Sequence, residues 1–268
     1  MKNILSIAGS DPSGGAGIQA DIKAISANGG YAMAVITALT AQNTQGVYGV
    51  QLVDPDFIAL QINHVFSDIQ VDAVKIGMLA NSEIIDAVAD RLVANKAHNI
   101  VLDPVMVAKG GDRLLAEEAV AALKHKLLPI ADVITPNLPE AADLLGEKEA
   151  TSQEEMVSQA NQLQALGAKN IVLKGGHLNA EQSPDYILSQ SGEGHWLDTK
   201  RIATKNTHGT GCTLSSTLAT QITQHDHFLD AVKASKAYIS EAIAHADSLN
   251  VGSGHGPVKH FCNTFKRH

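Results

Sequence analysis

Hydrophobic residues along the chain follow two alternating patterns. Short runs rich in β-branched residues are typical of buried strands, and segments whose apolar residues recur every three to four positions are typical of amphipathic helices. Alternation of the two predicts a mostly parallel sheet with helices on both faces. The strand-like runs begin at Asn3, Tyr31, Asp72, Asn99, Ala131 and Asn170, and the clearest helical segments read SEIIDAVADRLVANKA and EEAVAALKHKLLPI.

The pattern changes after Asp185. The stretch YILSQSGEGHWLDTKRI predicts two strands joined by a Gly-rich turn, which together form an antiparallel hairpin. Two long helical patterns follow, from Gly211 to Gln224 and from Leu229 to Ala246. Between them and the C-terminus, GSGHGP from Gly252 predicts a loop whose glycines allow close approach to a ligand.

Each strand-like run of the parallel part is followed by a polar or glycine-rich loop. In open parallel sheets the ligand crevice lies beyond the carboxyl ends of the strands. Six such loops on one rim therefore predict a ligand site there, although each alone is also an ordinary turn. In chain order these loops read GSDPSGGAG, AQNTQG, GML, DPVM, TPNLPE and KGGH.

Composition narrows the class of protein. With 268 residues, 44% of them apolar, the chain is long enough for one large domain spanning residues 1–268. A net charge of −8 argues against a nucleic-acid partner. No apolar stretch approaches the length of about 18 residues that a membrane span needs, so a cytoplasmic protein is expected. The two cysteines, Cys212 and Cys262, lie far apart and suggest neither a disulfide framework nor a structural zinc site.

Gly209, Thr210 and Gly211 precede a helical pattern. Free N–H groups and the helix dipole make such a position suitable for an anion, although glycines near a helix start are common. Two other phosphate motifs do not fit. GSDPSGG has a glycine where a P-loop needs lysine, and GAGIQA, from Gly15, matches a dinucleotide fingerprint but lacks the acidic residue expected after the second strand.

Several polar residues at the predicted rim have two possible roles. Asp103 and Glu140 offer hard oxygen ligands for a metal that bridges phosphates, or they are a turn residue and a first-turn helix acid. Lys174 can meet a phosphate or form a simple salt bridge. Gln42 and Asn43 present amides, which complement the edge of an aminopyrimidine but are also common in turns.

Taken in order from Ile7 to Phe261, these motifs resemble the hydroxymethylpyrimidine/phosphomethylpyrimidine kinases of thiamine biosynthesis, a family of the ribokinase-like superfamily. The most specific parts are AQNT, the N-x-x-E of Asn137 to Glu140, and GTGC. The resemblance rests on AGSDPSGGAGIQAD, TALTAQNTQGV, KIGML, VLDPVMVAKGGDRLL, ITPNLPEAADLL, VLKGGH, NTHGTGCTLSS and GHGPVKHF.

The resemblance implies a three-layer αβα fold, the use of ATP with Mg²⁺, a homodimer and two successive phosphorylations. Hydroxymethylpyrimidine would become its monophosphate and then its diphosphate. The resemblance also implies roles for residues at matching positions. Gln42 and Asp21 would bind the pyrimidine, with Met78 and Val105 as its apolar wall, and the turn of Gly209, Thr210, Gly211 and Cys212 would bind the transferring phosphate. Glu140 and Asp103 would organise the metal, and Lys174, Asn137 and Lys236 would contact the nucleotide or its phosphates.

Cys212 stands where most ribokinase-like sugar kinases have the catalytic aspartate of GTGD. A cysteine at a helix N-terminus is expected to have a depressed pKa and to serve as a thiolate base, or else the thiol only fills space beside the anion. In the first reaction an alcohol must lose a proton, whereas in the second the attacking group is already a phosphate oxygen. A base would therefore matter mainly for the first.

Three other functions are compatible with these motifs. Pyridoxal kinase has the same fold and acts on a similar hydroxymethyl-bearing ring, so either this activity or dual specificity is the alternative. A non-catalytic ligand sensor would have retained the pocket without the chemistry, and an NAD-dependent oxidoreductase rests on GAGIQA alone. The segment AKGGDRLL, from Ala108, is the candidate for a mobile cover over the site.

Overall fold

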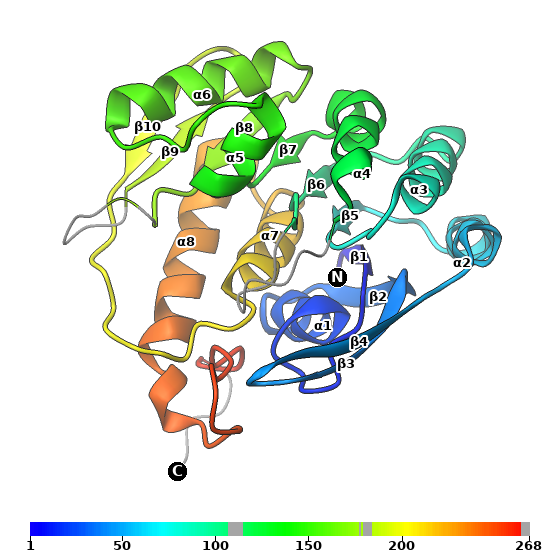
Figure 1. Ribbon diagram of the computed structural model, residues 1–268, viewed down its shortest axis with the longest axis horizontal. Helices are drawn as coiled ribbons and strands as arrows, with labels where there is room; N and C mark the ends of the chain where they lie inside the picture. Colours follow the sequence, from blue (N-terminus) through cyan, green and yellow to red (C-terminus); the bar gives the residue numbers. More distant parts are fainter. Residues whose placement is uncertain (107–114, 177, 179–183, 264–268) are drawn as a thin grey trace.

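The computed structural model describes residues 1–106, 115–176, 178 and 184–263, and it shows one large sheet between two layers of helices (Figure 1). Pairing along the sheet is parallel from β2 to β8 and antiparallel from β8 to β10. Across the sheet the strands are β10 (Gly194–Leu197), β9 (Asp185–Leu188), β8 (Asn170–Leu173), β7 (Val133–Ile134), β6 (Ile100–Leu102), β5 (Ala73–Ile76), β1 (Asn3–Ala8) and β2 (Tyr31–Ile36).

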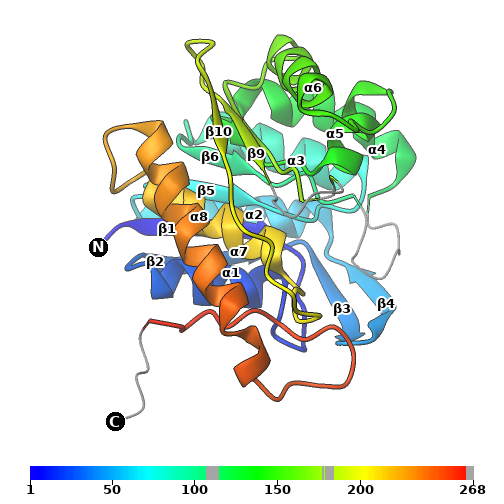
Figure 2. The same cartoon turned by 90° about the vertical axis from the view of Figure 1, so that its left-hand side faces the viewer.

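Helices cover both faces of this sheet, as Figure 2 shows. Each face has its own hydrophobic core, one built with side chains of α2 to α6 and the other with side chains of α1, α7 and α8. The predicted αβα sandwich and the hairpin after Asp185 are therefore confirmed. The first layer comprises α2 (Pro55–Asp68), α3 (Ser82–Ala94), α4 (Glu117–Ala122), α5 (Leu138–Leu145) and α6 (Gln153–Ala165), and the second comprises α1 (Gly17–Ala27), α7 (Thr210–Gln221) and α8 (Phe228–Ala244).

The run from Tyr31 to Thr40, predicted as one strand, is two. Thr37 separates β2 from β3 (Ala38–Asn43), which pairs with β4 (Gly46–Leu52) in a separate antiparallel sheet of two strands. The motif AQNTQG is therefore the tip of a hairpin and not a loop on the rim of the large sheet. The sequence pattern missed β4 because this strand has no buried residue and so lacks the alternation of buried and exposed positions.

Helix boundaries differ from the predicted ones where local chemistry intervenes. The segment predicted as one helix from Glu117 continues from α4 into a π-helical turn at Leu123–Leu127 and a 3₁₀ turn at Leu128–Ile130. Pro129 lacks the N–H that a continuing α-helix would need. At the end of α8, a 3₁₀ turn at Ala246–Ser248 replaces the predicted last helical residues.

Helix α7 is buried from Thr213 to Gln221 although it is rich in small and hydroxyl side chains. Three of those hydroxyls bond to the helix itself, because Ser215, Thr217 and Thr220 each donate to the carbonyl four residues earlier, at 2.9, 2.7 and 3.0 Å. The Thr213 and Ser216 hydroxyls instead pair with His260 and Asp21. The helix can therefore pack closely on the sheet and against α1 and α8 without burying an unpaired polar atom. Its N-terminus lies beyond the carboxyl ends of β1, β5 and β6.

None of the helices in the described ranges is long and apolar enough to cross a membrane. A cytoplasmic location stays a prediction.

Candidate active site

The turn Gly209–Cys212 opens α7. Gly209 has a φ of 74°, and a Cβ atom there would lie 1.7 Å from the carbonyl oxygen of Gly15. Only glycine fits such a position. No side chain caps the helix N-terminus. The N–H groups of its first turn are therefore left without a side-chain acceptor, which is the arrangement that an anion site requires.

Three charged side chains converge beside this turn. Lys174, at the end of β8, places its Nζ 3.2 Å from Oδ1 of Asp103 and 3.9 Å from Oε2 of Glu140. A Cβ atom on Gly211 would lie 3.4 Å from Asp103 and 3.6 Å from Lys174, so these two groups border the turn directly. The structure thus brings together the predicted anion turn, both predicted metal ligands and the predicted phosphate lysine.

Of these three side chains, Asp103 accepts the most hydrogen bonds. Its carboxylate is 2% exposed and accepts hydrogen bonds from Thr135 at 3.0 Å and Ser215 at 3.3 Å, besides that from Lys174. Thr135 follows β7 and Ser215 belongs to α7. One carboxylate therefore joins the ends of three neighbouring strands to the first turns of α7.

Asn137 and Glu140 form a capping box at the start of α5. The Asn137 side chain accepts from the Glu140 N–H, and the Glu140 carboxylate accepts from the Asn137 N–H, both at 2.8 Å. Burial raises the pKa of Glu140 to about 7, and the charge of Asp103 adds to this effect while Lys174 opposes it. The N-x-x-E motif thus has a helix-capping function that also holds Glu140 near Lys174.

These residues fit a magnesium ion that arrives with a nucleotide. The carboxylates of Asp103 and Glu140 both lie near the ammonium group of Lys174. In sites that bind a nucleotide, Mg²⁺ uses one or two carboxylates together with water and substrate phosphates. Within the described part of the chain, no three His, Cys, Asp or Glu side chains converge as a metal site. The arrangement is suited to a metal carried by phosphates rather than to a closed protein cage.

At the start of the turn, His208, which immediately precedes Gly209, connects it to two other segments. Its Nε2 lies 2.8 Å from Oδ2 of Asp11 and 3.3 Å from the Gln42 side-chain amide. Burial of Asp11 alone would raise its pKa, but bonds from His208, Ser13 and the Ala16 N–H outweigh this and lower it to about 2. A charged Asp11 therefore accepts the Nε2–H of His208, and the same ring nitrogen lies in contact with the Gln42 amide that is predicted to read a pyrimidine.

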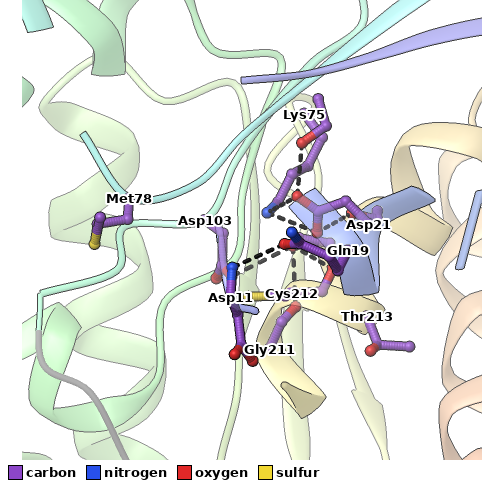
Figure 3. A network of polar contacts seen from close by, with 12 residues as sticks. Asp11, Gln19, Asp21, Lys75, Met78, Asp103, Gly211, Cys212 and Thr213 are labelled. Atoms are coloured by element: carbon purple, nitrogen blue, oxygen red, sulfur yellow. Dashed lines mark hydrogen bonds and ion pairs between the residues drawn. The ribbon is translucent and has the colours of Figure 1, made fainter. Parts of the chain in front are cut away.

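Asp21 does not lie where the resemblance placed it. Its carboxylate is fully buried and forms an ion pair with Lys75, with both oxygens 2.8 to 2.9 Å from Nζ (Figure 3). Ser6 and Ser216 donate to the same carboxylate at 2.6 and 2.7 Å. Asp21 has no exposed surface and both its oxygens already accept hydrogen bonds, so this structure offers no free oxygen of Asp21 to a pyrimidine.

Cys212 also differs from expectation. Its position at the helix N-terminus predicts a depressed pKa, but burial raises the pKa of the thiol to about 11. Lys75 opposes that rise, whereas Asp21 and Asp103 add to it, and the Gly17 N–H donates to the sulfur. The negative charges around the thiol and its burial together outweigh the helix dipole and the one nearby lysine.

The remaining predicted residues border the site at different depths. Met78 packs against Gly9, where a Cβ would lie 2.5 Å from the Met78 methyl group. The N–H of Val105 donates to the Asp103 carbonyl at 2.8 Å. Lys236 pairs with Asp185 at 2.5 Å, and Asp185 in turn accepts from the Gly175 N–H beside Lys174. The proposed cover AKGGDRLL lies outside the described residues except for its last leucine.

Sequence reasoning missed Lys75, Asp11 and His208 as parts of the site. A signal for Lys75 was present, because a lysine in the middle of the buried strand DAVKIGM requires a buried partner. Asp11 and His208 had no such local signal. The glycines of GAGIQA also gain an explanation: a Cβ on Gly15 would lie 2.4 Å from the His208 ring and one on Gly17 2.3 Å from the Gly9 carbonyl.

An anion turn at a helix N-terminus, flanked by carboxylates and a lysine at the rim of a parallel sheet, defines a small-molecule phosphotransferase. The sequence pattern of the phosphomethylpyrimidine kinase family matches residues 11–259. A hydroxymethylpyrimidine/phosphomethylpyrimidine kinase of Escherichia coli is 53% identical over 259 residues, which cover 97% of each chain.

Two similar solved structures are also kinases. A phosphomethylpyrimidine kinase of Clostridium difficile is 42% identical with a TM-score of 0.80, covering 91% of this chain and all of that one. A pyridoxal kinase of Staphylococcus aureus in complex with ADP is 33% identical with a TM-score of 0.90, covering 98% and 95%. The chain belongs to the phosphomethylpyrimidine kinase family, which confirms the resemblance, and it is an enzyme that transfers phosphoryl groups.

Because the pKa of Cys212 is raised to about 11, the thiol is protonated at neutral pH. In a Cys262→Ala variant, which leaves one thiol, we expect alkylation by iodoacetamide to accelerate about tenfold for each pH unit between 7 and 10, since only the thiolate reacts. Initial alkylation rates measured by mass spectrometry would test this. A plateau below pH 9 would show that the thiol ionises more readily than its surroundings indicate.

Proposed function

We propose that this protein uses ATP to phosphorylate 4-amino-5-hydroxymethyl-2-methylpyrimidine to its monophosphate and then to its diphosphate, in thiamine biosynthesis. The observation that carries the proposal is the position of the Gly209–Cys212 turn. Asp103 and Lys174 border it at Gly211, and the Gln42 amide contacts His208, which precedes Gly209. A phosphate held at the turn would therefore lie between a nucleotide side and a pyrimidine side.

The nucleotide side comprises Lys174, Asn137 and, through Asp185, Lys236. Lys174 offers a fixed positive charge to a phosphate oxygen, and its own pKa is raised because the attraction of Asp103 and Glu140 exceeds the opposing effect of burial. Glu140 and Asp103 would hold Mg²⁺, directly or through water. When bound, the ion neutralises charge that develops on the phosphates during transfer.

The pyrimidine side comprises Gln42 with Met78 and Val105. An amide can accept from an exocyclic amino group and donate to the adjacent ring nitrogen, which matches an aminopyrimidine edge. Thr40 and His208 hold the Gln42 amide at 3.2 and 3.3 Å. Asp21 contributes indirectly, because it fixes Lys75 and Ser216 below the turn.

Pyridoxal kinase activity, alone or in addition, is the second candidate, and the similarity to the S. aureus enzyme favours its inclusion in any assay. We expect the purified protein, with ATP and Mg²⁺, to convert hydroxymethylpyrimidine and its monophosphate, with the diphosphate appearing in both reactions. Product masses would be followed in separate reactions that include pyridoxine. Turnover of pyridoxine alone would overturn the pyrimidine assignment and the role of Gln42.

Replacement of Cys212 by alanine separates the two roles open to the thiol. If Cys212 accepts the proton of the attacking alcohol, Cys212→Ala slows the first phosphorylation by about 10²- to 10⁴-fold and leaves the second much less affected. Because the thiol is protonated at neutral pH, we expect equal losses in both steps, which would assign the thiol to lining the anion site. Measurement of both rate constants on one preparation, with Cys262→Ala as the matched control, tests this, and a loss confined to the first step would show that the thiol acts as the base.

We further propose that the protein is a homodimer formed through the β3–β4 hairpin. A sheet of two strands is marginal by itself, and this one carries four exposed large hydrophobic side chains, which a second copy of the same hairpin would cover. These are Leu39, Tyr48, Val50 and Leu52, which are 50%, 68%, 47% and 38% exposed.

Replacement of apolar hairpin residues by glutamate should separate the subunits. We expect light scattering to give twice the chain mass for the unaltered protein and the single chain mass for Tyr48→Glu/Val50→Glu. Val93→Glu is the control, because Val93 is an equally exposed apolar residue on α3. A monomeric unaltered protein, or a double variant that stays dimeric, would contradict the proposed interface.

A further inference from the structure

A short C-terminal loop, residues 252–256, touches the tip of the β3–β4 hairpin. Its backbone N–H groups at Gly254 and His255 donate to the side chain and the carbonyl of Thr44, at 3.2 and 2.8 Å. The Gln45 amide donates to Ser253 at 2.7 Å. Thr44 lies two residues after Gln42, so this loop holds the hairpin at the position of the pyrimidine-reading amide.

The other end of the same loop holds the segment that leads into the anion turn. Gly256 donates its N–H to the Asn206 side chain and accepts from the His208 N–H, both at 3.0 Å. His208 immediately precedes Gly209. The contact between His208 and Gln42, at 3.3 Å, closes a ring of contacts from the hairpin through residues 252–256 to the turn and back.

Glycine is required along this loop because the segments approach so closely. A Cβ atom on Gly254 would lie 2.0 Å from the Thr44 carbonyl oxygen, and one on Gly256 would lie 2.3 Å from Asn206 Oδ1. Gly252 has a φ of 68°, and its Cβ would lie 2.2 Å from Thr44 Oγ1. The sequence predicted close approach to a ligand, whereas the close approach that these glycines make is to the hairpin and to the turn segment.

We propose that residues 252–256 fix the spacing between Gln42 and the Gly209–Cys212 turn, and that Thr44 and Gly254 are positioning residues for the phosphoryl transfers. This inference rests on the proposed function, which assigns the pyrimidine ring to Gln42 and the transferring phosphate to the turn. The spacing matters because the hydroxymethyl oxygen sits on a short arm fixed to the ring. A shift of the hairpin moves that oxygen by the same amount.

The two reactions should respond differently to such a shift. In the first, ring position alone sets the position of the attacking hydroxyl, and misplacement by about 1 Å can cost about 10²-fold in rate. In the second, the attacking oxygen belongs to a phosphate on a longer arm with additional rotatable bonds, so it can still reach the transferring phosphate when the ring is displaced. The second reaction should therefore tolerate the displaced hairpin better.

Gly254→Ala and Thr44→Val test the proposal. The first forces the loop away from Thr44, and the second removes the oxygen that accepts from Gly254 while it keeps the side-chain shape. We expect Gly254→Ala to lower the ratio of the first rate constant to the second at least tenfold, and Thr44→Val to lower it severalfold, with the KM for ATP unchanged. Gly46→Ala, in the same hairpin with no atom within 4 Å of the added Cβ, should leave the ratio unaltered.

The ratio is the decisive quantity, because partial unfolding lowers both rate constants by the same factor. Should Gly254→Ala fail to fold, Thr44→Val decides alone. An unchanged ratio in the folded variants, with both reactions active in the unaltered protein, would overturn the positioning role and leave the proposed function intact. Absence of turnover of either pyrimidine by the unaltered protein would instead overturn the proposed function, and this inference with it.

Discussion

The site depends on the hydrogen bonds around one buried carboxylate, that of Asp103. Because it accepts from Lys174, Thr135 and Ser215, the ends of β6, β7 and β8 cannot move independently of α7. Loss of the positive partner would leave a buried charge, at a cost of about 3 to 5 kcal/mol. The position of Lys174, and with it the surroundings of Glu140 and of the anion turn, follows from this single group.

Much of the architecture could be predicted from the sequence because it is encoded locally. Buried parallel strands read as β-branched runs, and the loops after them must lie on one rim, so Asp103, Glu140, Lys174 and the Gly209–Cys212 turn could be assigned to one region before their contacts were known. The capping box at Asn137 is likewise a local motif. Family resemblance added the substrates and the cofactor, which no spacing of residues indicates.

The features that could not be predicted depend on partners far apart in the chain. Asp21 and Lys75 are 54 residues apart and Asp11 and His208 are 197 apart, and nothing near either member identifies the other. The burial of Asp21 and the raised pKa of Cys212 both follow from such distant neighbours. The separate hairpin was missed for a different reason, since an exposed strand has no buried face to leave a pattern in the sequence.

The small, hydroxyl-rich side chains of α7 have a consequence for how this enzyme can change during evolution. Since the helix is packed between the sheet and its neighbours, and Ser215, Thr217 and Thr220 bond to its own backbone, exchanges among Ser, Thr, Ala and Cys change its volume little, whereas larger side chains would separate the layers. The residue at the Cys212 position, the last of the anion turn, can therefore change its chemical group but hardly its size.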